Sequence, residues 1–175
     1  FDESMQLAQK AVASLWCGAA AAHGPMPQRV NERIELAAPP DAVWRRIGDF
    51  ADVAWHPGVA SAQADHGNEP GSVRTVRLRE GGQLVETLKR RSDAERSLTY
   101  ELDDAGPLPV SGLRATLTVQ PAGGAGSVVE WSASFLRADR SPRPAAGQDD
   151  AAAVAAVAEV FRAGLAALRG TEPPP

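Results

Sequence analysis

The stretch formed by residues 149–169 constrains the fold of this chain more than any other feature. Its larger apolar residues recur at helical spacing and share one face: Val154, Val157, Ala158, Phe161, Leu165 and Leu168. Aspartates begin the stretch, Arg169 lies in its last turn and Gly170 follows, which is the order of charges and caps that a helix favours. The sequence therefore predicts one long C-terminal helix, which needs a second layer to cover its apolar face.

That second layer is predicted to be a β-sheet, because short strand patterns bounded by glycine and proline fill the rest of the chain. In the first pattern Val30, Ile34 and Leu36 alternate with polar residues, as in a half-buried strand. The predicted strands are residues 30–36, 59–64, 72–79, 83–90, 97–102, 113–119 and 128–136. Because turns connect the last six in order, we expect an antiparallel meander and an α+β fold.

A short helix is predicted between the first two strands. Pro39 and Pro40 end the first strand and begin the helix, Val43, Trp44 and Ile47 form its apolar stripe, and Gly48 ends it. This helix, the break at Gly48-Asp49-Phe50 and the corner Trp55-His56-Pro57 resemble the front end of helix-grip proteins, the SRPBCC superfamily. Its members include the polyketide cyclase/dehydratase-like, START-like and Bet v 1-like proteins.

The resemblance implies a helix-grip fold. In this fold a curved antiparallel sheet of about seven strands wraps around the long C-terminal helix, with short helices after the first strand. It also implies a small-molecule cavity between the sheet and the helix.

The first 22 residues resemble an export signal. Lys10 precedes an apolar run from Ala11, and Ala20-Ala21-Ala22 provides a small-residue exit. We therefore expect a signal peptide over 1–22 (with 1–4 as an upstream extension), a mature start at His23 and a periplasmic location. An ordinary amphipathic N-terminal helix is the alternative. One domain is expected over 23–170, followed by a disordered tail over 171–175.

Charge and cysteine content exclude several classes. The chain has 18 basic and 22 acidic residues without a basic cluster, which argues against nucleic-acid binding. The single cysteine, Cys17, excludes an internal disulfide and a multi-cysteine zinc site. The sequence contains no run of about 18 apolar residues, so no membrane span is predicted. The spacing of His23, His56 and His66 predicts no metal site, and no cofactor is expected.

The hairpin around Glu80-Gly81-Gly82 leaves two possible phases. With a two-residue Gly81-Gly82 loop, Val76 and Leu78 share a face with Val85 and Thr87. With a three-residue loop and a left-handed Gly82, they share a face with Leu84, Glu86 and Leu88. We favour the second phase, because it gathers four apolar side chains on one face. It also brings Arg74 and Glu86 to that face.

The predicted pocket groups are polar and aromatic residues of this inner face. A buried Glu86 requires a partner, which Arg74 can provide. The pair is interpreted either as a polar anchor or general acid/base, or as a structural ion pair at the sheet rim. Tyr100 is interpreted either as a hydroxyl donor in the pocket or as a core residue. His56 is interpreted either as a ligand contact or as a residue that caps a turn at the surface. The ligand-pocket candidates are Arg74, Val76, Leu78, Leu84, Glu86, Leu88, Tyr100, Trp131, Phe135, Phe161 and His56.

One subgroup of the superfamily is similar to nearly all of the chain after residue 22. The matching segments are His23-Gly24-Pro25, Val43-Trp44 with Ile47 and Asp49-Phe50, Gly67-Asn68-Glu69-Pro70-Gly71-Ser72, Gly81-Gly82, Leu108-Pro109-Val110-Ser111, Val129-Glu130-Trp131, and Asp149-Asp150-Ala151-Ala152-Ala153-Val154 before Phe161-Arg162-Ala163-Gly164-Leu165. They resemble the MxaD-type periplasmic accessory proteins of bacterial methanol-oxidation gene clusters.

The resemblance implies a non-enzymatic role that supports electron transfer from a quinone-dependent methanol or alcohol dehydrogenase to cytochrome c. No catalytic residue is expected. The alternatives are a cyclase or dehydratase that uses Glu86, Arg74 and Tyr100, or a carrier of a lipid or other small hydrophobic ligand.

Overall fold

The computed structural model describes residues 22–170, which form one antiparallel sheet and two helices. The order along the chain is β1 (Gln28–Leu36), α2 (Pro40–Ile47), β2 (Val59–Ala64), β3 (Val73–Leu78), β4 (Gln83–Ser92), β5 (Ser97–Asp104), β6 (Val110–Pro121), β7 (Ser127–Arg137) and α3 (Asp150–Gly170). The predicted signal peptide, except Ala22, and the predicted disordered tail lie outside the described residues.

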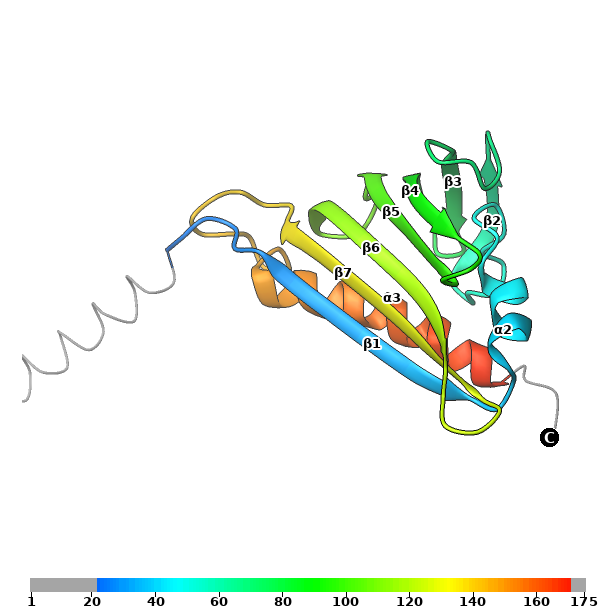
Figure 1. Cartoon of the computed structure of the whole chain (residues 1–175). Coiled ribbons are helices and arrows are strands. Elements are labelled where there is room, and N and C mark those ends of the chain that lie inside the picture. Colours follow the sequence, from blue (N-terminus) through cyan, green and yellow to red (C-terminus); the bar gives the residue numbers. More distant parts are fainter. Residues whose placement is uncertain (1–21, 171–175) are drawn as a thin grey trace, which may run out of the picture.

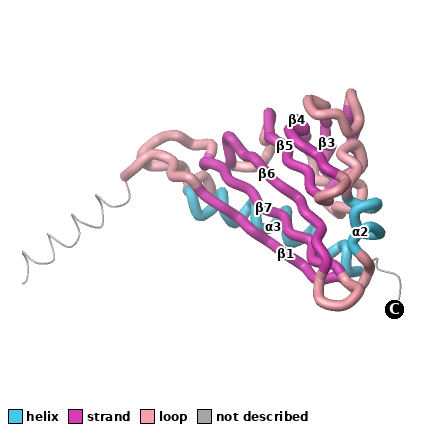
Figure 2. The backbone as a smooth tube through the Cα atoms, viewed as in Figure 1, coloured by secondary structure: helices cyan, strands magenta, loops and turns pink. Residues whose placement is uncertain are grey.

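The seven strands lie in the order β1-β7-β6-β5-β4-β3-β2. Strands β2 to β7 form the expected meander, and β1 closes the series by pairing with β7. Helix α3 runs across the sheet beside β1 and β7 (Figure 1). Helix α2 lies near the C-terminal end of α3 (Figure 2). The α+β helix-grip architecture predicted from the sequence is confirmed.

Helix α2 connects strands at opposite edges of the sheet. Pro39 and Pro40 lie at its start, and Val43, Trp44 and Ile47 are buried as predicted. The Trp44 indole Nε1 donates to Asp93 at 2.8 Å, which joins the helix to the β4–β5 turn. Turns over residues 49–58 then lead to β2. Between β1 and β2 the structure therefore has one regular helix, where the resemblance implied short helices.

The β3–β4 hairpin has the favoured phase. Arg74 lies opposite Glu86 and Val76 opposite Leu84, so these side chains share the inner face. The loop itself begins one residue earlier than predicted, since the Leu78 amide donates to the Gly82 carbonyl at 3.0 Å. Gly81 and Gly82 have φ angles of 105° and 86°, which residues with a side chain rarely adopt.

Helix α3 is the more apolar of the two described helices. By length and composition alone it could cross a membrane, a property that it shares with helices that cover a sheet. Here Ala153, Val157, Ala158, Phe161, Gly164, Leu165 and Leu168 are buried, and the helix contacts β1 and β7. The expected absence of a membrane span therefore stays a prediction.

Candidate functional site

An ion pair on the inner face of the sheet is the most buried charged feature of the site. Arg74 on β3 and Glu86 on β4 are both 4% exposed. Arg74 Nη2 and Nε donate to Glu86 Oε2 at 2.6 and 3.1 Å. Arg74 Nη1 donates to the Phe50 carbonyl at 2.9 Å. The pair therefore joins two adjacent strands to the loop after α2.

Aromatic rings lie on the guanidinium of Arg74. Its Cζ is 4.2 Å from the centre of the Phe50 ring and 4.9 Å from that of Tyr100. Such contacts are attractive, because the face of an aromatic ring carries negative potential. Arg74 is thus held by a carboxylate, a carbonyl and two rings, which fixes its orientation on the sheet.

Tyr100 connects the ion pair to an aromatic cluster. Burial raises the pKa of the Tyr100 hydroxyl well above its ordinary value, and the negative charge of Glu86 adds to this rise. The hydroxyl therefore stays protonated at physiological pH. Its oxygen accepts a hydrogen bond from Trp131 Nε1 at 3.2 Å. At this position Tyr100 can orient a group by hydrogen bonding, but it cannot act as a base near neutral pH.

The aromatic cluster joins the sheet to α3. The rings of Trp131 on β7 and Phe161 on α3 stack with their centres 4.1 Å apart and 12° between their planes. Trp55 packs against Trp131 at 5.6 Å between ring centres. Trp55 Nε1 is a buried donor without a hydrogen-bond partner in the described structure. An acceptor on a bound molecule would satisfy this donor.

His56 lies between the loop after α2 and α3. Its Nδ1 accepts from the Gly58 amide at 2.9 Å, so Nε2 carries the proton and donates to the Val160 carbonyl at 2.7 Å. Gly164 makes this approach possible, because a Cβ there would lie 2.6 Å from His56 Cδ2 and 3.0 Å from the Trp131 ring. His56 is 9% exposed, so the interpretation of a surface residue is wrong. Its bond to Gly58 does cap a turn.

This geometry predicts how stability depends on pH. Burial lowers the pKa of His56 below its ordinary 6.5, although the bond to the Val160 carbonyl partly offsets the effect. Below pH 6.5 the unfolded chain therefore binds a proton that the folded protein excludes. The free energy of unfolding should fall as the pH decreases from 6.5 toward the lowered pKa of the folded state. Urea unfolding at several pH values measures this, and His56→Gln should flatten that part of the profile.

The predicted pocket residues other than His56 form two hydrophobic clusters and the Arg74–Glu86 ion pair. Leu88, Tyr100, Trp131, Phe135 and Phe161 belong to the main core between the sheet and α3. Val76 belongs to a smaller cluster with Val53 and Val59, against which Leu78 and Leu84 pack. Arg74 and Glu86 lie opposite each other on β3 and β4. The structure thus brings the polar and aromatic candidates together, and it places Val76, Leu78 and Leu84 in a separate apolar cluster.

Sequence reasoning did not select Phe50, Trp55 and Gly164 as site residues. Phe50 is fully buried and supplies both a ring and a carbonyl to Arg74. Phe50 and Trp55 lie in turns, where no periodicity marks the buried face. Gly164 breaks an otherwise apolar helix stripe without any turn signal nearby. That isolated glycine was the one local sign of a close contact on α3.

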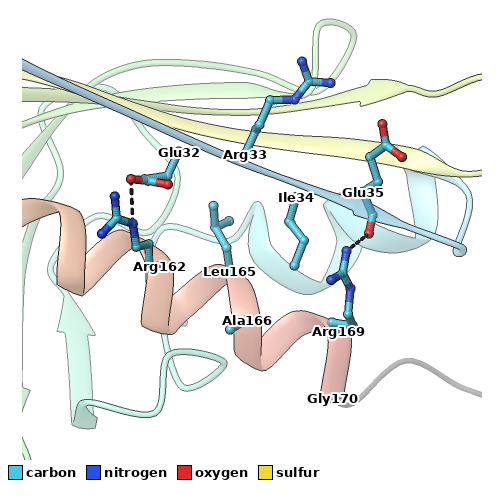
Figure 3. A pocket seen from close by; sticks show the side chains of 9 residues that line it. All are labelled: Glu32, Arg33, Ile34, Glu35, Arg162, Leu165, Ala166, Arg169 and Gly170. Carbon is cyan, nitrogen blue, oxygen red and sulfur yellow. Dashed lines mark hydrogen bonds and ion pairs between the residues drawn. The ribbon is translucent and has the colours of Figure 1, made fainter.

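A separate groove lies between β1 and the end of α3 (Figure 3). Its volume is about 680 Å³, and it is lined by Glu32, Arg33, Ile34, Glu35, Arg162, Leu165, Ala166, Arg169 and Gly170. Arg162 Nε is 2.9 Å from Glu32 Oε1, and Arg169 Nη2 donates to the Glu35 carbonyl at 3.1 Å. None of the predicted pocket residues lines this groove.

Comparison with known proteins identifies a family, a plant relative and a similar solved structure. Residues 27–171 match the family described as polyketide cyclase / dehydrase and lipid transport. MLP-like protein 423 of Arabidopsis thaliana is 30% identical over 116 residues, which cover 61% of this chain and 74% of the relative. The solved structure of the protein XoxI from Bacillus cereus is similar with a TM-score of 0.70 and 26% identity, over 81% of this chain and 93% of that chain.

An aromatase/cyclase shares the fold. The crystal structure of Zhui aromatase/cyclase from a Streptomyces species superposes with a TM-score of 0.68 over 83% of this chain and 93% of that chain. Its sequence identity is 18%, so the likeness concerns the architecture alone.

Proposed function

This chain belongs to the polyketide cyclase/dehydrase and lipid-transport family, and we propose that it acts as a non-catalytic accessory protein that binds a partner protein, a small hydrophobic ligand, or both. In the finer form of this proposal, the protein works in the periplasm. There it supports electron transfer from a quinone-dependent methanol or alcohol dehydrogenase to cytochrome c. The similarity of its sequence segments to the MxaD-type accessory proteins supports this form.

The observation that carries the non-catalytic role is that the polar groups of the inner face bind one another. Arg74 and Glu86 form a buried ion pair, and both ring nitrogens of His56 are engaged by backbone groups. The Tyr100 hydroxyl accepts from Trp131 and stays protonated. A general acid or base must reach the proton that it transfers. Here the candidate groups are held in bonds within the protein, which favours binding over turnover.

One observation favours the enzymatic alternative. Arg74, Glu86 and Tyr100 lie together on the inner face, and Trp55, which packs on Trp131, has a buried Nε1 donor without a hydrogen-bond partner among the described residues. If a substrate displaced part of this cluster, the carboxylate and the hydroxyl would flank it. A cyclase or dehydratase that uses these residues is therefore the second candidate.

The test measures cytochrome c reduction by a purified quinone-dependent methanol dehydrogenase, with and without the mature chain. We expect faster reduction when the chain is present at equimolar amounts, and the Glu86→Gln variant should keep this effect. A reduction rate that does not change from substoichiometric to excess protein would refute the dehydrogenase role. Loss of an intrinsic cyclase or dehydratase turnover in a folded Glu86→Gln variant would establish the enzyme instead.

The periplasmic location is part of the same proposal. Arg137 Nη2 on β7 donates to the His23 carbonyl at 2.9 Å, so the predicted first residue of the mature chain is held against the sheet. The chain used in the electron-transfer assay should be isolated from the periplasm, where its intact mass should correspond to a start at His23. An uncleaved chain in the cytoplasm would contradict the location.

A further inference from the structure

We propose that the groove between β1 and α3 binds an extended, acidic segment of a partner protein, which adds to the free edge of β1 as an extra strand. This inference does not require the partner to be the dehydrogenase. It concerns a surface that lies apart from the inner-face cluster of Arg74, Glu86 and Tyr100.

The groove follows a strand edge. Glu32, Arg33, Ile34 and Glu35 are consecutive in β1, and all four line it. Successive side chains of a strand point to opposite faces of the sheet, so four consecutive residues border one groove only along the backbone edge. Figure 3 shows this alternation, with Glu32 and Ile34 directed toward α3 and with Arg33 and Glu35 directed away from it.

The edge offers hydrogen-bonding groups. Strand β1 pairs with β7 along its entire length without a register shift, and its other side has no strand partner in the described structure. The Glu35 carbonyl accepts from Arg169 across the groove, so the backbone groups of Glu35 face the groove. Because this orientation repeats every second residue, the amide and carbonyl of Arg33 face it as well.

Helix α3 forms the opposite wall. Arg162, Leu165, Ala166 and Arg169 lie on one side of the helix, at intervals of three and four residues. The side chains of Ile34, Leu165 and Ala166 provide an apolar floor, and the four edge residues span about 13 Å. A strand placed between an edge strand and a helix can form backbone bonds on one side. Its alternate side chains can then pack against the floor.

The charges of the groove favour an acidic segment. On the side that faces α3, Arg162 and Arg169 accompany a single carboxylate, that of Glu32. Arg162 is paired with Glu32, whereas Arg169 binds the Glu35 carbonyl and has no ion-pair partner among the described residues. This region is therefore positive in a chain whose net charge is −4. A backbone amide of the bound segment can replace Arg169 as the donor to the Glu35 carbonyl. Arg169 is then released to bind an acidic side chain of the segment.

The probe is a set of labelled peptides with the nine-residue length of β1, which alternate Glu with Val, Ile, Leu or Phe. Fluorescence anisotropy should give a dissociation constant below about 1 mM for at least some of these peptides. The dissociation constant should rise at least about tenfold when Lys replaces Glu. N-methylation of alternate peptide bonds on the edge-facing side removes donors without changing the side chains. It should also weaken binding at least about tenfold.

A matched pair of variants locates the site. Ala166→Trp fills the groove and should weaken binding at least about tenfold. Ala163→Trp places the same side chain on an exposed position of α3 that does not line the groove, and it should bind like the unchanged protein. Thermal unfolding should verify that both variants are folded.

Any one of three binding results would overturn the proposal: no binding by any acidic peptide at about 1 mM, equal binding by N-methylated peptides, or equal effects of the two tryptophan variants. In the bound state the Arg33 amide should become more protected from hydrogen exchange. Unchanged protection would also exclude edge pairing.

Discussion

Replacement of Glu86 by alanine should lower the free energy of unfolding by about 3–5 kcal/mol, because it leaves the Arg74 guanidinium buried without its counter-charge. The side chains of both residues are 5% exposed, so water cannot solvate the remaining charge in the folded state. The Phe50 carbonyl and the rings of Phe50 and Tyr100 remain in contact with Arg74 and offset part of the loss. Urea unfolding with tryptophan fluorescence measures the change.

An exposed ion pair on adjacent strands provides the matched control. Arg114 Nη1 is 2.8 Å from Glu101 Oε1, and these side chains are 53% and 39% exposed. Glu101→Ala should therefore cost less than about 1 kcal/mol. Replacement of both buried residues together, as Arg74→Met with Glu86→Leu, should restore much of the stability, since it leaves no unpaired charge. A coupling free energy near zero between positions 74 and 86 would contradict the buried pair.

Truncation of Phe161 to alanine should destabilise the protein by about 3–5 kcal/mol, through lost apolar burial and the cavity that remains. Phe161 is 3% exposed and stacks on Trp131 at 4.1 Å between ring centres. The cavity would lie between the sheet and α3, where Trp55 packs on Trp131 and His56 binds the helix. Because His56 binds the adjacent Val160 carbonyl, a displaced helix would lose that hydrogen bond too. The midpoint of urea unfolding reports the loss.

The control for Phe161 is its neighbour on α3. The side chain of Arg162 is 69% exposed, so Arg162→Ala should cost less than about 1 kcal/mol. Phe161→Leu retains much of the apolar volume and should fall between the two alanine variants. If Phe161→Ala cost less than about 1 kcal/mol, the docking of α3 on the sheet would be wrong.

Local periodicity was sufficient to predict the elements and their buried faces. Alternation identified β1, and helical spacing placed Phe161 and Leu168 on the buried side of α3. The hairpin phase could also be predicted, because only one of its two options put four apolar side chains on one face. The bounds were less accurate: β6 begins at Val110, whereas the predicted strand began at residue 113. Gly112 has a φ of 61° beside an irregularity in the β6–β7 register, which apolar alternation does not reveal.

The sequence by itself determined the buried faces of the strands and helices and suggested that Arg74 and Glu86 form a pair. These conclusions depend on the periods of strands and helices, which are local properties of the backbone. The tertiary structure decided which distant groups meet. It placed Phe50 on Arg74, brought the Val160 carbonyl to His56, and left the free edge of β1 beside Arg162 and Arg169. Such contacts depend on the path of the 49–58 turns and on how α3 crosses the sheet, and no period in the sequence specifies either arrangement.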